Sequence, residues 1–225
     1  SRRRSARSTR SRCAASSRSA WCTCGQRPDS GYASRSNSAN VNGGSIRSNG
    51  ATMVPTRGTR FWTGFMQNGF GAQTLKIQVI ARNATSGTVS IPLTGWSTTF
   101  TVAGNGVAVI DIPTAAENTG SGTVAQKGIL IQSLDSVNVV ATSLQNFTHE
   151  ASQILPEAAL GNRYRVDAYQ GLPNFNNLHK SELLVVATQD GTQVRITPSV
   201  NTASGQLAGV PFTVNLNAGQ TYQLQ

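Results

Sequence analysis

The clearest structural signal in the sequence is the run Leu75-Lys-Ile-Gln-Val-Ile-Ala81, in which apolar and polar residues alternate. A period of two is typical of a strand that buries one face and exposes the other to water. A second alternating run, Val89-Ser-Ile-Pro92, follows the turn signal Gly87-Thr88. Strands at this short spacing, separated by turn residues, favour an all-β fold.

Similar runs continue to the end of the chain, and their polar positions hold Thr, Ser, Asn and Gln more often than charged residues. Thr, Val and Ile suit a pleated surface that is half buried. We therefore expect about ten to twelve strands in antiparallel, sandwich-like sheets. A single helical turn fits only residues 155–161. The further strand-like runs lie at 100–102, 107–112, 129–131, 137–140, 164–168, 183–187, 194–196, 212–216 and 222–224.

The runs also repeat one another. Strand, tight turn and strand occur at 75–102 and again at 183–214, and a partial third copy lies at 128–141. This order favours repeated hairpins as the building unit. We predict two related modules packed together, which meet near residues 114–162.

The charge is concentrated at one end of the chain. Residues 1–60 hold twelve Arg and one Asp, whereas residues 61–225 hold seven Lys or Arg and eight Asp or Glu. Only 12% of all residues are charged, against about 25% in an ordinary soluble domain. The first part is rich in Arg and Ser and has few apolar residues, so it buries too little surface to offset its chain entropy. We expect residues 1–57 to be disordered and residues 58–225 to form one β-rich domain.

Three interpretations of the Arg/Ser-rich segment 1–57 stay open, and one of them is an inert extension of the domain. Its mixture of Arg, Ser, Ala, Cys and Trp resembles a non-native reading frame of GC-rich DNA. Its Arg-Ser dipeptides instead suit a tail that grips nucleic-acid phosphates. Aromatic platforms for bases are nearly lacking there, with only Trp21 and Tyr32. A nucleic-acid-associated protein is therefore the alternative function, and nucleic acid is the less favoured partner.

The sequence predicts no bound metal or cofactor. The three cysteines, at positions 13, 22 and 24, lack the spacing of zinc ligands. Gly120-Ser-Gly-Thr-Val-Ala125 resembles a dinucleotide-binding loop, but no helix is expected after it. Calcium binding through loop carboxylates stays open, because such sites need several oxygens whose convergence a sequence does not show.

No catalytic residues are predicted. The chain holds only two histidines, His149 and His179, and neither belongs to a recognisable nucleophile or metal motif. A pair of carboxylates could meet in the fold as in a glycosidase, although their spacing does not indicate it. The chain has no run of eighteen apolar residues, so no membrane span is predicted.

Aromatic side chains outside the strand runs are the best recognition residues that the sequence offers. Trp96 and Phe175 lie in segments rich in Gly, Pro and Asn, where loops and ligand contacts concentrate. We predict these two as ligand-binding residues. Asn83-Ala-Thr85 and Asn146-Phe-Thr148 match the acceptor pattern for N-linked glycans.

Several pieces, in their order along the chain, resemble the IgGFc-binding protein N-terminal domain family. The pieces are Gly58-Thr-Arg-Phe-Trp-Thr-Gly-Phe-Met-Gln-Asn68, residues 87–92, 100–102, 129–133, 155–156 and 159–161 with Tyr164, and residues 183–188 and 192–198. The resemblance implies an extracellular, non-enzymatic β-rich module, of the kind found in mucus proteins of animals and in surface proteins of bacteria. It implies a protein or glycan ligand, and it does not by itself imply immunoglobulin Fc for this copy.

Together these observations predict a binding or adhesion module of a larger secreted or cell-surface protein. No export signal is visible in this sequence, because the Arg cluster is not followed by an apolar stretch. The last residues, 220–225, stop inside a strand-like run. We therefore expect the domain to be truncated there and the last strand to lack its partner strand.

Overall fold

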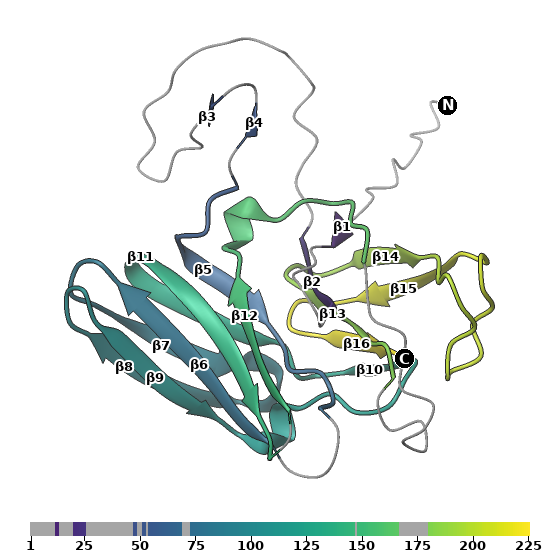
Figure 1. The fold of residues 1–225 in the computed structure, drawn as a ribbon, viewed down its shortest axis with the longest axis horizontal. Coiled ribbons are helices and arrows are strands. Elements are labelled where there is room, and N and C mark those ends of the chain that lie inside the picture. The colour runs from purple at the N-terminus through teal and green to yellow at the C-terminus, as the bar shows by residue number, and fades with distance from the viewer. Residues whose placement is uncertain are drawn as a thin grey trace, which may run out of the picture.

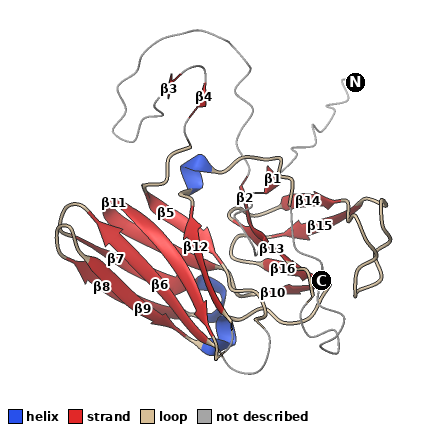
Figure 2. Ribbon diagram, in the orientation of Figure 1, coloured by secondary structure: helices blue, strands red, loops and turns tan. Residues whose placement is uncertain are grey.

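The structure, a computed structural model, describes residues 54–68, 73–146, 148–166 and 180–225, and the backbone of residues 12–13, 20–25, 47–48 and 51–52. Nearly all regular structure in these residues is strand (Figure 1 and Figure 2). Their helices are single 3-10 turns at Pro92–Thr94, Thr114–Ala116 and Glu157–Ala159. The last of these lies inside the predicted turn at 155–161. The all-β, antiparallel fold class is confirmed.

Seven strands form a sandwich, and the central one is the unusually long strand β11 (Ile129–Leu144). The first part of β11 pairs with β5 and β7, the last part pairs with β12, and β6 pairs along residues 137–144. The register shifts between Gln132 and Val137, which is where a bulge bends a strand. The other strands are β5 (Gly58–Thr63), β6 (Thr74–Ala81), β7 (Thr85–Ile91), β8 (Trp96–Val102), β9 (Val107–Ile112) and β12 (His149–Ile154).

Two layers result, and both use β11. One layer has the order β8-β7-β11-β5, and the other has the order β9-β6-β11-β12. Their inward side chains form a single apolar core, to which Phe61, Ile77, Val89, Phe100 and Val139 contribute from five different strands. The alternation read from residues 75–81 is therefore the burial pattern of β6, whose residues at 75, 77, 79 and 81 are all buried.

A second sheet lies beside the sandwich (Figure 1). Its central strands are β13 (Leu183–Ala187) and β16 (Thr221–Leu224), and β10 (Thr123–Ala125) pairs with the far side of β16. A separate hairpin-like pair, β14 (Thr192–Ile196) and β15 (Phe212–Leu216), covers one face of it through a smaller apolar cluster. Two further short strands, β3 (Arg47–Ser48) and β4 (Ala51–Thr52), pair with each other.

The second sheet packs on the outer face of the β5–β11 layer. Trp62 and Leu130 point outward from that layer and meet Leu184 and Val186 of β13 in a third apolar cluster, together with Met66. The chain also connects the sandwich to the second sheet, because β10 follows the sandwich strand β9 in the sequence and pairs with β16 of the second sheet. Next to β10, the Gly128 N–H donates to the Gly219 carbonyl at 2.9 Å.

The predicted hairpins are formed only in part. Strands β7 and β8 pair as a hairpin, and β14 pairs with β15, but the first two strands of each copy do not pair with each other. The first copy places β6 and β7 in opposite layers, with partners β9 and β11 for β6 and β8 and β11 for β7. In the second copy β13 and β14 belong to different sheets, and the third copy is the single strand β11. A tight turn can carry the chain across to the other layer as readily as back along the same sheet. The structure does not confirm the prediction of two related modules.

The predicted strand at 164–168 is not formed at residues 164–166, and residues 167–168 lie outside the described residues. The Gly161 N–H donates to the Tyr164 hydroxyl, which folds this segment back on itself. The expectation that the last strand lacks a partner is also wrong, since β16 pairs with β13 on one side and β10 on the other.

Within the Arg/Ser-rich segment, the described residues include four short strands where disorder was expected. Strand β2 (Ala20–Gly25) pairs in parallel with β13, and β1 (Arg12–Cys13) pairs with β2. Residues 183–187 are almost wholly apolar, as expected of a strand covered on both faces. The remaining stretches of 1–57, apart from β3, β4 and 54–57, lie outside the described residues, so the domain boundary at 57/58 stays a prediction.

Candidate functional site

A groove opens between β8 and β9, along one side of the sandwich. It has a volume of about 590 Å³ and is lined by Trp96–Thr101 and Ala108–Asp111. The two strands are joined by a tight turn in which the Gly106 N–H donates to the Ala103 carbonyl at 3.0 Å. Because β8 and β9 then pair with different layers, they separate as they leave the turn. The groove therefore forms because the turn between β8 and β9 carries the chain from one layer to the other.

Trp96 lies at one end of this groove, as the first residue of β8. The preceding helical turn ends at Gly95, whose φ of 77° is left-handed, a conformation that glycine adopts without strain. Trp96 then pairs with Ile91 across the two strands. Its ring is half-buried and packs on the sandwich core. Trp96 is therefore a strand residue rather than a loop residue, with part of its ring open to the groove.

The groove combines hydroxyl groups with apolar surface and little charge. Ser97, Thr99 and Thr101 alternate along β8 as exposed side chains, while Phe100 and Ile110 are buried at the base. The charged residue of the lining, Asp111, accepts a hydrogen bond from the Lys76 ammonium at 2.5 Å on the neighbouring strand. Such a lining offers hydrogen bonds and aromatic contact to an uncharged, polar ligand.

The structure does not place the second predicted residue beside Trp96. Phe175 lies outside the described residues, so its role stays a prediction. His149 is exposed at the start of β12, and His179 also lies outside the described residues. The dinucleotide-like segment 120–125 leads into strand β10, and no helix begins there.

A buried polar network fills the junction between the sandwich and the second sheet. The Asn118 side chain donates to the Phe65 carbonyl at 2.9 Å and accepts from the Thr221 hydroxyl at 2.5 Å. Beside it, Glu117 accepts hydrogen bonds from the Asn68 N–H and from the Gln73 amide. Burial raises the pKa of Glu117 above its ordinary range, although these hydrogen bonds oppose the rise.

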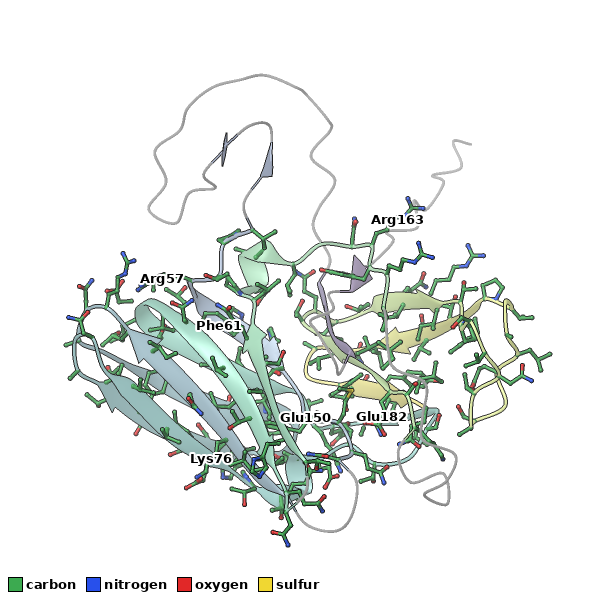
Figure 3. All side chains as sticks on the ribbon, viewed as in Figure 1. Arg57, Phe61, Lys76, Glu150, Arg163 and Glu182 are labelled. Carbon is green, nitrogen blue, oxygen red and sulfur yellow. The ribbon has the colours of Figure 1, made fainter. Side chains whose placement is uncertain are left out.

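Glu182 lies at the same junction, just before β13, and Glu150 of β12 lies near it (Figure 3). Burial raises the pKa of Glu182 to about 8; the Gln225 amide, which donates to its carboxyl at 2.5 Å, opposes the rise, and the charge of Glu150 adds to it. Sequence reasoning did not single out Asn118 or Glu182. Both lie next to other polar residues in the sequence, and their hydrogen-bond partners lie 103 and 43 positions away.

The raised pKa of Glu182 predicts a stability that falls as pH rises. The folded protein keeps a proton that the unfolded chain releases near pH 4.5, so the stabilisation is complete below pH 4.5 and is lost as pH rises through about 8. Glu182→Gln should remove this loss and raise the free energy of unfolding at pH 9 by about 1 to 2 kcal/mol, a fraction of the full linkage energy because the side chain is partly solvated. Urea unfolding at pH 5 and pH 9 measures it. Asp190→Asn, the same charge change at an exposed site, should leave the pH dependence unchanged; equal pH profiles for wild type and Glu182→Gln would contradict the prediction.

The part of the chain that the structure describes contains no group of three or more His, Cys, Asp or Glu residues placed to hold a metal ion. None of its helices is long and apolar enough to cross a membrane. These two findings concern the described ranges only.

Comparison with known proteins connects one part of the chain to a family. No curated protein and no solved structure matches the chain. The family model described as IgGFc binding protein matches residues 150–225, which include most of β12 and all of β13 to β16. The groove at residues 96–111 lies outside that match. The resemblance read from the sequence is thus confirmed over residues 150–225, the part of the chain that the IgGFc-binding family model matches.

Proposed function

We propose that this protein is a non-enzymatic binding or adhesion module of a larger secreted or cell-surface protein. The observation that carries the proposal is the family match over residues 150–225. The matched segment supplies the second sheet, which is built onto the sandwich through the Trp62–Leu184 cluster and the Asn118–Thr221 hydrogen bond. Sandwich and second sheet therefore act as one unit, in which the family segment is supported by residues outside it.

The groove between β8 and β9 is the binding surface that we assign to this module. It offers the half-buried ring of Trp96, the hydroxyls of β8, and strand edges that have no partner among the described residues. Aromatic side chains with one open face dominate binding energy at protein interfaces. Its one carboxylate, Asp111, already has Lys76 as its partner. A neutral segment of a protein or a neutral glycan suits this lining better than a highly charged polymer does.

The proposal is tested by the binding of the full chain to three immobilised probes: immunoglobulin Fc, purified mucin and an array of neutral glycans. Retention on at least one probe, with weak dependence on salt, is the expected result. Weak salt dependence follows because the groove carries almost no free charge. No retention on any of the three would contradict the proposed function.

Trp96 should carry a large share of the binding energy. Trp96→Ala is expected to weaken binding to the retained probe at least about tenfold, which corresponds to about 1.4 kcal/mol. Because the ring also packs on the core, Trp96→Phe is included to keep apolar contact while reducing the open surface, and it should give an intermediate affinity. Surface plasmon resonance measures both variants. Val200→Ala, at an exposed position between β14 and β15, serves as the control, and equal losses in Trp96→Ala and Val200→Ala would rule the groove out.

A further inference from the structure

Strand β9 is an open sheet edge with apolar side chains on its outer face. Among the described residues it pairs only with β6. Its outward residues Val107 and Val109 are 54% and 57% exposed, and Ile80, the partner of Val107 on β6, adds apolar surface beside them. Natural sheet edges are usually protected by Lys, Pro, a bulge or a cover. β9 has none of the first three: its six residues read Val-Ala-Val-Ile-Asp-Ile.

The edge strand β8, which lies across the groove from β9, differs in this respect. Its outward positions hold Ser97, Thr99 and Thr101, which are exposed and whose hydroxyl groups are both donors and acceptors of hydrogen bonds. Transfer of these hydroxyl groups from water into an interface contributes little free energy, whereas transfer of the valine side chains of β9 is favourable. Of the two edges, β9 is therefore the one suited to pairing with another strand.

The side chains of β9 are compatible with those of a second copy of β9 that runs antiparallel to it. With Val109 opposite Val109 of the second copy, residues 107–111 overlap fully, and side chains of the same face meet. Ala108 then stands opposite Ile110, and Val107 stands opposite Asp111. No like charges face each other, and each Asp111 keeps Lys76 of its own chain as a partner. Residues 61–225 are also nearly neutral in total, so two copies of this part do not repel strongly.

We propose that the protein forms a homodimer by antiparallel pairing of β9 with β9 of a second copy, centred on Val109. This pairing joins the two β9-β6-β11-β12 layers into one continuous sheet with an isologous interface. It brings the two Val109 side chains into contact and covers part of the exposed surface of Val107 and Val109 in both copies. Because residues of β9 also border the Trp96 groove, the dimer brings two grooves next to each other and allows a multivalent ligand to bind with avidity.

Sedimentation equilibrium of the full chain at physiological salt, over about 1 to 100 µM, tests the dimer. The expected mass rises from 23.7 kDa toward twice that value. Val109→Lys places two ammonium groups at the centre of the interface and should weaken the dimer at least about tenfold. Thr99→Lys makes the same change at an exposed site of the other edge, β8, and should leave the dimer intact.

Thermal unfolding of each variant establishes that it is folded, and Val107→Lys replaces Val109→Lys if the latter does not fold. Trp96→Ala should leave the dimer unchanged, so a failure of ligand binding and a failure of dimerisation are observed separately. A wild-type chain that stays monomeric at the highest concentration would overturn the proposal. Equal dimerisation of Val109→Lys and Thr99→Lys, or selective loss in Thr99→Lys, would overturn it as well.

Discussion

Gly87→Ala should destabilise the sandwich by about 3 kcal/mol, at the upper end of overpacking costs. Gly87 lies in β7 between β8 and β11, and a Cβ atom there would be 2.0 Å from the Gln132 carbonyl oxygen and 2.6 Å from Cζ of Phe100. The carbonyl belongs to β11, which is held by strands on both sides, so it cannot move away cheaply. The Phe100 ring in turn occupies the space that the missing side chain leaves. Urea denaturation measures the loss of unfolding free energy.

The neighbouring position provides the control for Gly87. Ser86 lies on the same strand with its side chain on the outer face, opposite Thr101. Ser86→Ala should change the free energy of unfolding by less than about 0.5 kcal/mol, as is usual for surface substitutions. A Gly87→Ala protein as stable as Ser86→Ala would mean that β7, β8 and β11 do not pack as the structure has them.

Asn118→Ala should destabilise the protein by about 2 to 3 kcal/mol through the junction between the sandwich and the second sheet. Asn118 is 2% exposed, and the Thr221 hydroxyl that donates to it is fully buried. Truncation leaves this hydroxyl with a longer bond to the Ala125 carbonyl, at 3.3 Å, as the contact that remains. It also removes the side-chain donor to the Phe65 carbonyl.

Thr221→Val separates loss of the hydrogen bond from loss of packing. Valine keeps the shape of threonine, and removing both polar partners together costs less than leaving one of them unpaired. The double variant Asn118→Ala/Thr221→Val should therefore be more stable than the sum of the single changes implies, by about 1 kcal/mol. Additive effects in chemical denaturation would show that the two side chains do not act as a pair across the junction.

The local pattern of the sequence predicted the strands well, because alternation follows burial directly. Residues 75–81 illustrate this, since each apolar residue of the odd series is buried in β6. The same pattern does not reveal partners. The turn at residues 82–84 joins strands of opposite layers, although its composition is that of a hairpin turn. Pairing is decided by β11, a strand that lies some fifty residues away and that holds both layers together.

The sequence predicted one residue of the candidate site, Trp96, but did not predict the groove in which it lies. Trp96 could be singled out because a large aromatic residue follows Pro, Leu, Thr and Gly, where a loop is expected. The groove beside it depends on the separation of β8 and β9 into different layers, which no local signal contains. The buried junction residues were missed for a related reason: Asn118 is polar in a polar segment, and only the distant Thr221 shows that it is buried.

The most direct test of the assigned binding surface is amide hydrogen exchange of the full chain with and without the probe it retains, whether immunoglobulin Fc, mucin or a neutral glycan. Amides at an open strand edge exchange with solvent quickly, so an occupied groove slows them measurably. We expect protection to concentrate in residues 96–101, the β8 side of the groove, because pairing of β9 with a second copy already slows exchange at residues 108–111. Protection confined to the β14–β15 pair at residues 192–216, with unchanged exchange along β8, would contradict the assignment.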